Sequence, residues 1–184
     1  MELTQVILVD VGDRQTGVME KMEAHKQGLL HRAFSVFIFN TKGEMLLQQR
    51  AISKYHSGGL WTNACCSHPY PEEETKAAAQ RRLKEELGFE TPINKVFDFV
   101  YKADFDNGLT ENEFDHVYVG EFEGKIDFNK QEVMDVCYKD VHEICHSLQT
   151  HPQKYTAWFH LAFPKVENWW KLRYKDKPDS YRVA

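Results

Sequence analysis

One amphipathic helix with two well-marked ends limits most strongly what this chain can fold into. Pro71 bars the helix from starting earlier, and the glutamates at positions 72–74 suit its positive first turn. Gly88 stands where a left-handed C-terminal cap would end the helix, after about four turns. Arg82 and Glu86 are four residues apart, so they share one face beside an apolar seam. A polar pair at that place predicts a bound ligand.

The length and composition of the chain are those of an ordinary globular protein. Its 184 residues are 42% hydrophobic and 28% charged, and we expect residues 1–184 to form a single domain. No apolar run approaches a membrane span, and Met1 to Gly12 lacks the pattern of a secretory signal, so we expect a cytoplasmic protein with no membrane partner. A net charge of -5 argues against a nucleic-acid partner. The four cysteines lack a paired C-x-x-C spacing and are expected to be free thiols.

Apolar alternation and turn residues predict the other elements. Strands are expected at 6–9, 31–39, 45–49, 95–101, 113–121 and 132–138, with a further strand and loop over 61–69. Residues 13–30 show no clear period and predict a loop with one helical turn. A short helix is expected over 140–147, and a C-terminal helical segment from Thr156 is expected to break or restart at Pro164. The fold expected from this order is α/β, with a mixed sheet between helices.

The sequence around the marked helix resembles the Nudix box, G-x5-E-x7-R-E-U-x-E-E-x-G-U, in which U is a bulky apolar residue. The matching positions are Glu73, Arg81, Leu83, Glu85, Glu86, Gly88 and Phe89. Ser67 replaces the first glycine of the box, and Arg82 replaces the glutamate of R-E-U. In the Nudix family that glutamate helps to hold the metal ions that activate water, whereas an arginine binds phosphate itself. Arg82 therefore speaks against a hydrolase.

Three further motifs are similar to those of the type 1 isopentenyl diphosphate isomerases. They are Asn63-x-x-Cys66-x-His68-Pro69, Leu30-His31-x-Ala33-Phe34-Ser35 and Glu111-Asn112-Glu113, and the resemblance extends from about Val6 to Trp158. It implies an enzyme that interconverts isopentenyl and dimethylallyl diphosphate by 1,3-proton transfer, with a small isoprenoid diphosphate as its partner. The alternatives are a Nudix diphosphohydrolase and a Nudix-like module that binds a ligand without turnover.

The alternation of side chains along a strand also suggests candidate ligands for a metal ion. Glu111 and Glu113 are two apart at the start of a strand and point to one face. If the hairpin and the central loop face one cleft, His25, His31 and His68 complete an N3O2 shell that suits zinc or manganese better than magnesium. Spacing alone favours solvated side chains, whereas the resemblance implies that all five bind one metal ion. The other histidines are expected on the surface or behind the site: His56, His116, His142, His146, His151 and His160.

The resemblance assigns the substrate-binding residues as well. It implies that four basic side chains, scattered in the sequence, hold the diphosphate: Lys21, Arg50, Lys54 and Arg82. It implies that Glu86 ligates a Mg²⁺ ion bridging that diphosphate. Planar guanidinium groups suit such a ligand because each can contact two oxygens at once.

Catalytic roles are implied for Cys66, Glu113, Tyr101 and Trp158. Without the resemblance, cysteine and tryptophan would be ordinary core residues. Protonating an unactivated alkene creates a tertiary carbocation, which the indole face of Trp158 can stabilise. Glu113, with Tyr101 as relay, and Cys66 would carry the protons, and the sequence leaves open which is acid and which is base. The start of the helix near Pro71 and cationic neighbours are expected to lower the pKa of Cys66.

Overall fold

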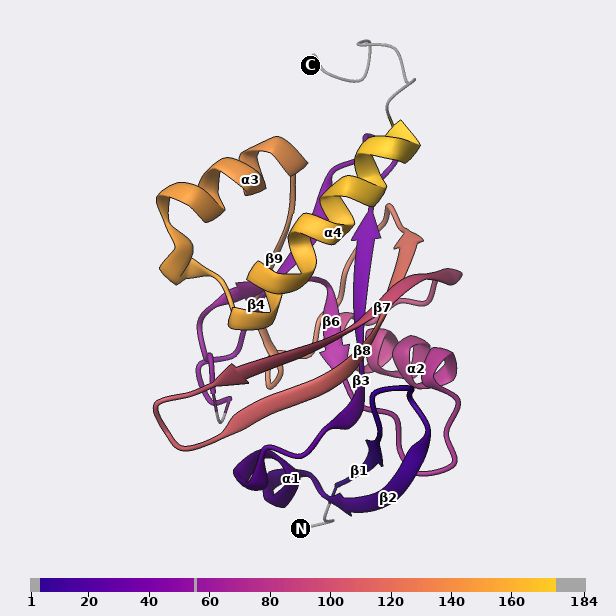
Figure 1. Cartoon of the computed structure of the whole chain (residues 1–184). Helices are drawn as coiled ribbons and strands as arrows, with labels where there is room; N and C mark the ends of the chain where they lie inside the picture. The colour runs from indigo at the N-terminus through magenta and orange to yellow at the C-terminus, as the bar shows by residue number, and fades with distance from the viewer. Residues whose placement is uncertain (1–3, 55, 175–184) are drawn as a thin grey trace.

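The computed structural model describes residues 4–54 and 56–174 (Figure 1). The strands are β1 (Gln5–Val9), β2 (Gln15–Glu20), β3 (His31–Phe39), β4 (Met45–Arg50), β5 (Trp61–Thr62), β6 (Cys65–Ser67), β7 (Ile93–Asp104), β8 (Thr110–Glu121) and β9 (Val133–Lys139). The helices are α1 (Lys21–Gln27), α2 (Thr75–Leu87), α3 (Val141–Thr150) and α4 (Ala157–Tyr174), with a 3-10 turn η1 (Pro152–Lys154) before α4. None of the described helices is long and apolar enough to cross a membrane.

β3 is the strand around which the sheet is built (Figure 1). It pairs in parallel with β8 along its whole length and antiparallel with β6, and its two ends reach β1 and β4. β8 in turn pairs antiparallel with β7. The register sets His31 beside Glu113, and Glu113 beside Tyr101, in three neighbouring strands. Side chains far apart in the sequence therefore meet at one end of β3.

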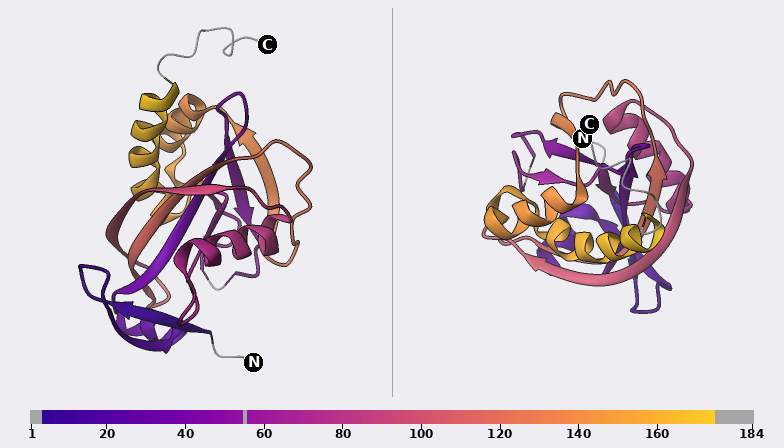
Figure 2. Two further views of the ribbon diagram at one scale, coloured as in Figure 1. Left: turned by 90° about the vertical axis from the view of Figure 1, so that its right-hand side faces the viewer. Right: turned by 90° about the horizontal axis from the view of Figure 1, so that it is seen from above.

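Different helices cover the two faces of the sheet (Figure 2). Val36 and Ile38, on one face of β3, belong to the apolar core that contains the buried apolar residues of α2. Phe37 and Phe39, on the other face, belong to the core that contains residues of α3 and α4, such as Phe159. This alternation buries both faces of β3, as is usual for a strand paired in parallel. The expected mixed sheet between helices is confirmed.

Both predicted hairpins are present. Residues 31–39 and 45–49 lie in β3 and β4, which pair only next to their turn, and β7 and β8 are longer than predicted. The predicted helix after Asp140 is α3, which extends to Thr150, and the Asp140 side chain accepts hydrogen bonds from the first backbone N–H groups of the helix.

The expectation of a loop with one helical turn over residues 13–30 is wrong. The structure has β2, paired antiparallel with β1, followed directly by α1. The carboxylate of Glu20 accepts the backbone N–H of Glu23 at 2.9 Å, and α1 ends at Gly28 with a φ of 61°. β2 lies at the edge of the sheet, and its residues are exposed or half-buried, so they show no apolar alternation.

The marked helix ends at Gly88, as predicted, with a φ of 76°. It begins only at Thr75, so the glutamates at 72–74 precede the helix and do not fill its first turn as expected. Glu73 accepts hydrogen bonds from Nε and Nη2 of Arg81 at 2.7 and 2.8 Å instead. This pair ties the approaching chain to the helix.

The expected interruption at Pro164 is wrong as well, because α4 runs through it without a break. Phe159, Phe163 and Val166 are buried on the face of α4 that packs against the sheet. We infer that this packing outweighs the one backbone hydrogen bond that a proline cannot donate.

Candidate active site

One hollow in the described structure collects most of the predicted site residues. Its lining consists of Lys21, Arg50, Lys54, His56, Cys66, Ser67, His68, Arg82, Glu86, Tyr101, Glu111, Glu113 and Trp158. The predicted catalytic side chains and the predicted diphosphate ligands are all among them. His25 and His31 are not, but their rings contact the ring of His68, with centroids 5.7 and 4.9 Å away.

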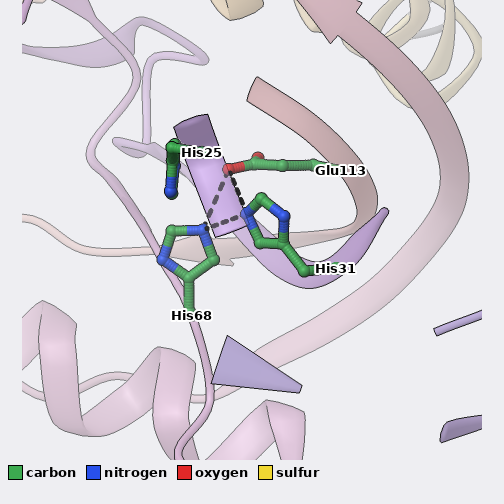
Figure 3. Close-up of side chains that lie close together, drawn as sticks. All are labelled: His25, His31, His68 and Glu113. Atoms are coloured by element: carbon green, nitrogen blue, oxygen red, sulfur yellow. Dashed lines mark hydrogen bonds and ion pairs between the residues drawn. The ribbon is translucent and has the colours of Figure 1, made fainter. Parts of the chain in front are cut away.

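Three histidines and one glutamate form a compact group, with their polar atoms turned toward one another (Figure 3). One ligand atom from each of His25, His31, His68 and Glu113 lies within 4.8 Å of all the others. Nε2 of His68 is 3.1 Å from Nε2 of His31 and 2.9 Å from Oε1 of Glu113. All four side chains are buried or nearly so, at most 9% exposed.

Backbone contacts orient two of these rings. Nδ1 of His25 lies 2.6 Å from the carbonyl oxygen of Lys21, and Nδ1 of His31 lies 2.8 Å from that of Leu29. A carbonyl only accepts, so both rings donate from Nδ1, and Nε2 is the nitrogen left for a metal ion. Burial lowers the pKa of His25 to about 4 and that of His68 to about 3, which makes both rings neutral near pH 7. Neutral rings beside a carboxylate fit a divalent metal ion.

Tyr101 joins the two glutamates of β8. Its hydroxyl donates to Oε2 of Glu113 at 2.6 Å and lies 3.2 Å from Oε2 of Glu111. The compact group of His25, His31, His68 and Glu113 does not include Glu111. Oε1 of Glu111 lies 3.2 Å from Nε2 of His56 instead. Burial, and next the charge of Glu113, raises the pKa of Glu111 to about 8. Burial alone would also raise the pKa of Glu113, but its contacts with His31 and His68 hold that pKa well below its usual range.

Basic side chains of the hollow meet two carboxylates. Arg82 donates to Oε1 of Glu86 at 2.6 Å, and Gln48 donates to the other oxygen at 3.0 Å. Glu132, just before β9, forms ion pairs with both Lys54 and Arg82. Burial lowers the pKa of Lys54 to about 8. Arg82 and Glu86 thus share a helix face, as predicted, and Lys54 is linked to the same cluster.

Cys66 lies in a buried polar wall. Its Sγ donates to Oδ1 of Asn63 at 3.0 Å and is 3.4 Å from Oγ of Ser35. Burial raises the pKa of the Cys66 thiol, and the nearby carboxyl of Asp115 adds to the shift. The expectation of a lowered pKa is therefore wrong. Its premise fails because α2 begins only at Thr75 and the Cys66 side chain is partly buried among polar groups.

Trp158 forms another wall of the hollow and is 3% exposed. The guanidinium carbon of Arg50 lies 5.1 Å from the centre of the indole ring, so this π-face already carries a cation. His56 meets the indole at 5.7 Å in an edge contact and stacks on Phe105 at 4.6 Å. The indole of Trp158 is thus contacted by Arg50 over its face and by His56 at its edge.

Sequence reasoning does not identify three polar residues of these walls. His56 lines the hollow, and Glu132 bridges two of its cations, but neither lies in a segment whose pattern reveals it. Asp115 continues the two-residue alternation of Glu111 and Glu113, which is a signal that the sequence does contain.

Of the other histidines, one more is buried. Nε2 of His116 lies 3.0 Å from the carboxylate of Asp13, and the ring is on the opposite face of β8 from Glu113. The remaining four are exposed or half-buried, as expected: His142, His146, His151 and His160.

Comparisons with known proteins agree with this fold and show the family of the chain. The family model of the NUDIX domain matches residues 29–159. The isopentenyl-diphosphate Delta-isomerase of Pectobacterium atrosepticum is 49% identical over 171 residues, which cover 93% of this chain and 96% of that protein. The isopentenyl-diphosphate Delta-isomerase of Serratia proteamaculans is 47% identical over 172 residues, which cover 91% and 96%.

Two solved structures share the architecture. DR0079 from Deinococcus radiodurans aligns with a TM-score of 0.67 at 16% identity, over 80% of this chain and 90% of that one. A MutT protein from Methanosarcina mazei aligns with a TM-score of 0.62 at 18% identity, over 80% and 96%. At such identities these structures show the fold alone. The family model and the close relatives go further: the chain belongs to the isopentenyl-diphosphate Delta-isomerases, within the NUDIX fold.

Proposed function

We propose that this protein interconverts isopentenyl diphosphate and dimethylallyl diphosphate by moving a proton between C2 and C4 of the isoprenoid chain. One observation carries the proposal: a single hollow brings a half-buried thiol, a tyrosine-bonded carboxylate and an indole face together with four basic side chains. The basic side chains suit a diphosphate, and the other groups suit a small alkene. The relatives described above carry the name of this activity.

Lys21, Arg50, Lys54 and Arg82 are the residues that bind the diphosphate in this proposal. A diphosphate carries several negative charges, and hydrogen bonds between charged partners are stronger than those between neutral ones. Glu86 is 3% exposed and bonded to Arg82, which suits a carboxylate that shares a Mg²⁺ ion with the substrate.

The histidine group is proposed to hold one Zn²⁺ or Mn²⁺ ion through His25, His31, His68 and Glu113, with Glu111 as the fifth ligand that the resemblance implies. Nitrogen donors mixed with carboxylate oxygens suit these ions better than magnesium. Such an ion, when bound, supplies a positive charge that fixes the Glu113 carboxylate beside the reacting carbons.

A 1,3-proton shift needs one group that starts with a proton and one that starts without it. Burial favours the protonated thiol at Cys66, and the histidine contacts favour the ionised carboxylate at Glu113. The hydroxyl of Tyr101, 2.6 Å from that carboxylate, is placed to relay a proton. One C–H bond forms at C4 and one breaks at C2, so the reaction needs no oxidant and no reductant.

Protonation at C4 leaves a tertiary carbocation at C3, which must be stabilised and kept from water. The buried face of Trp158 suits this task, and a desolvated cation over an indole is stabilised by roughly 2 kcal/mol. The ring of His56 and the neighbouring Phe105 help to exclude water from that wall.

The proposal is tested by incubating the protein with isopentenyl diphosphate and magnesium in heavy water and recording proton and phosphorus NMR spectra. An isomerase places deuterium in a methyl group of dimethylallyl diphosphate while both phosphorus signals persist. Cys66→Ala and Glu113→Gln should each lower the rate by about 10²- to 10⁴-fold, the range of general acid–base catalysis.

Other spectra would contradict the proposal. Release of inorganic phosphate, or conversion of the diphosphate to a monophosphate, would identify a diphosphohydrolase. Broadened but otherwise unchanged signals would identify a module that binds without turnover. Cys66→Ala at the full rate would remove the thiol from the mechanism even if the isomerase activity stood.

A further inference from the structure

Behind the thiol of Cys66 lies a buried polar pair that the proposed mechanism does not use. Ser35 on β3 is 3% exposed, and Asp115 on β8 is 1% exposed. Oγ of Ser35 donates to Oδ2 of Asp115 at 2.8 Å and lies 3.4 Å from Sγ of Cys66. The register of β3 and β6 sets Ser35 directly beside Cys66. The three side chains therefore form a short polar chain that ends at the sulfur.

Burying this carboxyl is costly for the fold. Oδ1 of Asp115 is inaccessible to solvent and has no hydrogen-bond partner among the described residues. A buried polar atom without a partner costs roughly 1–3 kcal/mol, and an apolar side chain of similar size would avoid that cost. Packing alone thus gives no reason for a carboxyl at this position, and within the described part of the chain this carboxyl accepts one hydrogen bond, from Ser35.

We propose that Ser35 and Asp115 are positioning residues for the catalytic thiol, an inference that rests on the proposed role of Cys66. Asp115 takes the hydroxyl hydrogen of Ser35, so Ser35 turns an oxygen lone pair toward the sulfur and not a hydrogen. Asp115 acts only through Ser35, and neither residue lines the hollow.

The side chain of Asn63, the other neighbour of the Cys66 sulfur, also presents an acceptor oxygen to it. Nδ2 of Asn63 donates to the carbonyl oxygens of Val36 and Cys65, at 3.0 and 2.9 Å, so its Oδ1 faces Cys66. The sulfur is then bounded by two acceptors, Oδ1 of Asn63 and Oγ of Ser35. A thiol has one hydrogen and weak hydrogen bonds, so two fixed acceptors restrict the directions that this hydrogen takes.

This arrangement predicts an effect on kcat with little effect on KM, because the pair does not contact the basic side chains that bind the diphosphate. Ser35→Ala should lower kcat roughly tenfold, the factor that corresponds to about 1.4 kcal/mol of transition-state stabilisation. Asp115→Leu should lower kcat to a similar extent, since it frees the Ser35 hydroxyl to turn toward the sulfur. Asp115→Asn should keep most of kcat, because its amide oxygen still accepts the Ser35 hydrogen.

The experiment compares kcat and KM for isopentenyl diphosphate in Ser35→Ala, Asp115→Leu, Asp115→Asn and the double variant Ser35→Ala/Asp115→Leu, each with its thermal midpoint. Ser147→Ala on α3 is the matched control. The rate at which iodoacetamide alkylates Cys66, followed by peptide mass, is the second readout. We expect this rate to change in Ser35→Ala and Asp115→Leu but not in Asp115→Asn, and the double variant to match Ser35→Ala, because residues that act through one contact are not additive.

Several results would overturn the inference. The first is an unchanged kcat in Ser35→Ala. The second is an equal loss of kcat in Asp115→Asn and Asp115→Leu. The third is a double variant whose fold-loss of kcat is the product of the two single fold-losses. If Asp115→Leu does not fold, Ser35→Ala and Asp115→Asn still decide. Cys66→Ala separates the two levels: full activity in this variant refutes the proposed role of the thiol, whereas an inactive Cys66→Ala with unaffected Ser35 and Asp115 variants refutes only the positioning pair.

Discussion

Replacing Trp158 by alanine is expected to lower kcat about 30-fold. The indole is 3% exposed and already holds the guanidinium of Arg50 over its face, at 5.1 Å from the ring centre. A desolvated cation over such a face is stabilised by roughly 2 kcal/mol, and each 1.4 kcal/mol is about tenfold in rate. Trp158→Phe keeps a weaker π-face and should lose only about fivefold, which corresponds to about 1 kcal/mol.

The assay is conversion of isopentenyl diphosphate followed by NMR, with kcat and KM determined separately. Truncating a buried tryptophan can cost about 3–5 kcal/mol of folding free energy, so near-UV circular dichroism must show that each variant is folded at the assay temperature. Trp170→Ala, on the same helix but outside the hollow, is the matched control and should keep the parent kcat. Equal losses of kcat in Trp158→Phe and Trp158→Ala would refute the cation-stabilising role.

Three further outcomes are expected. His68→Ala should abolish the retention of a tightly bound divalent ion during dialysis, as measured by elemental analysis, and parent-like metal content and activity in this variant would exclude the histidine site. The value of kcat/KM should fall above about pH 8, because the pKa of Lys54 is lowered to about 8 by burial and its charge is lost above that pH; Lys54→Arg should move this limb upward, and an unchanged limb would exclude Lys54 as its origin. Arg82→Gln should raise KM roughly 10- to 100-fold with a smaller change in kcat, since it removes a charge-assisted contact to the diphosphate, and an unchanged KM would exclude that contact.

Local patterns predict those parts of the structure that depend on local physics. Alternation along β8 places Glu111 and Glu113 on one face, and both line the hollow. Helical spacing places Arg82 beside Glu86, and Gly88 ends α2. The resemblance then supplies residues that no spacing would bring together, including the basic side chains of the hollow.

What the sequence leaves unpredicted depends on contacts between distant segments. The raised pKa of Cys66 follows from burial behind β3 and β8, which a motif cannot report. Alternation sets the face of a strand but not the rotamer, so it does not predict that Glu111 turns to His56. The sequence does not predict strand β2, because this edge strand is held by backbone pairing and carries no apolar pattern.

The parallel pairing of β3 with β8 has a consequence for how the chain acquires its site. Ser35 and Asp115, which face each other across this pairing, are 80 residues apart in the sequence. Glu113 follows the last of the three histidines, His68, by 45 residues, so the histidines are synthesised before the glutamate that completes their group. Such a non-local pairing is slow to form, because the entropy of closing a long loop is lost before the contact is gained. An ion held by residues from α1, β3, the segment after β6, and β8 binds the folded chain far better than the unfolded one. During refolding, uptake of the metal should therefore report the arrival of β8 against β3.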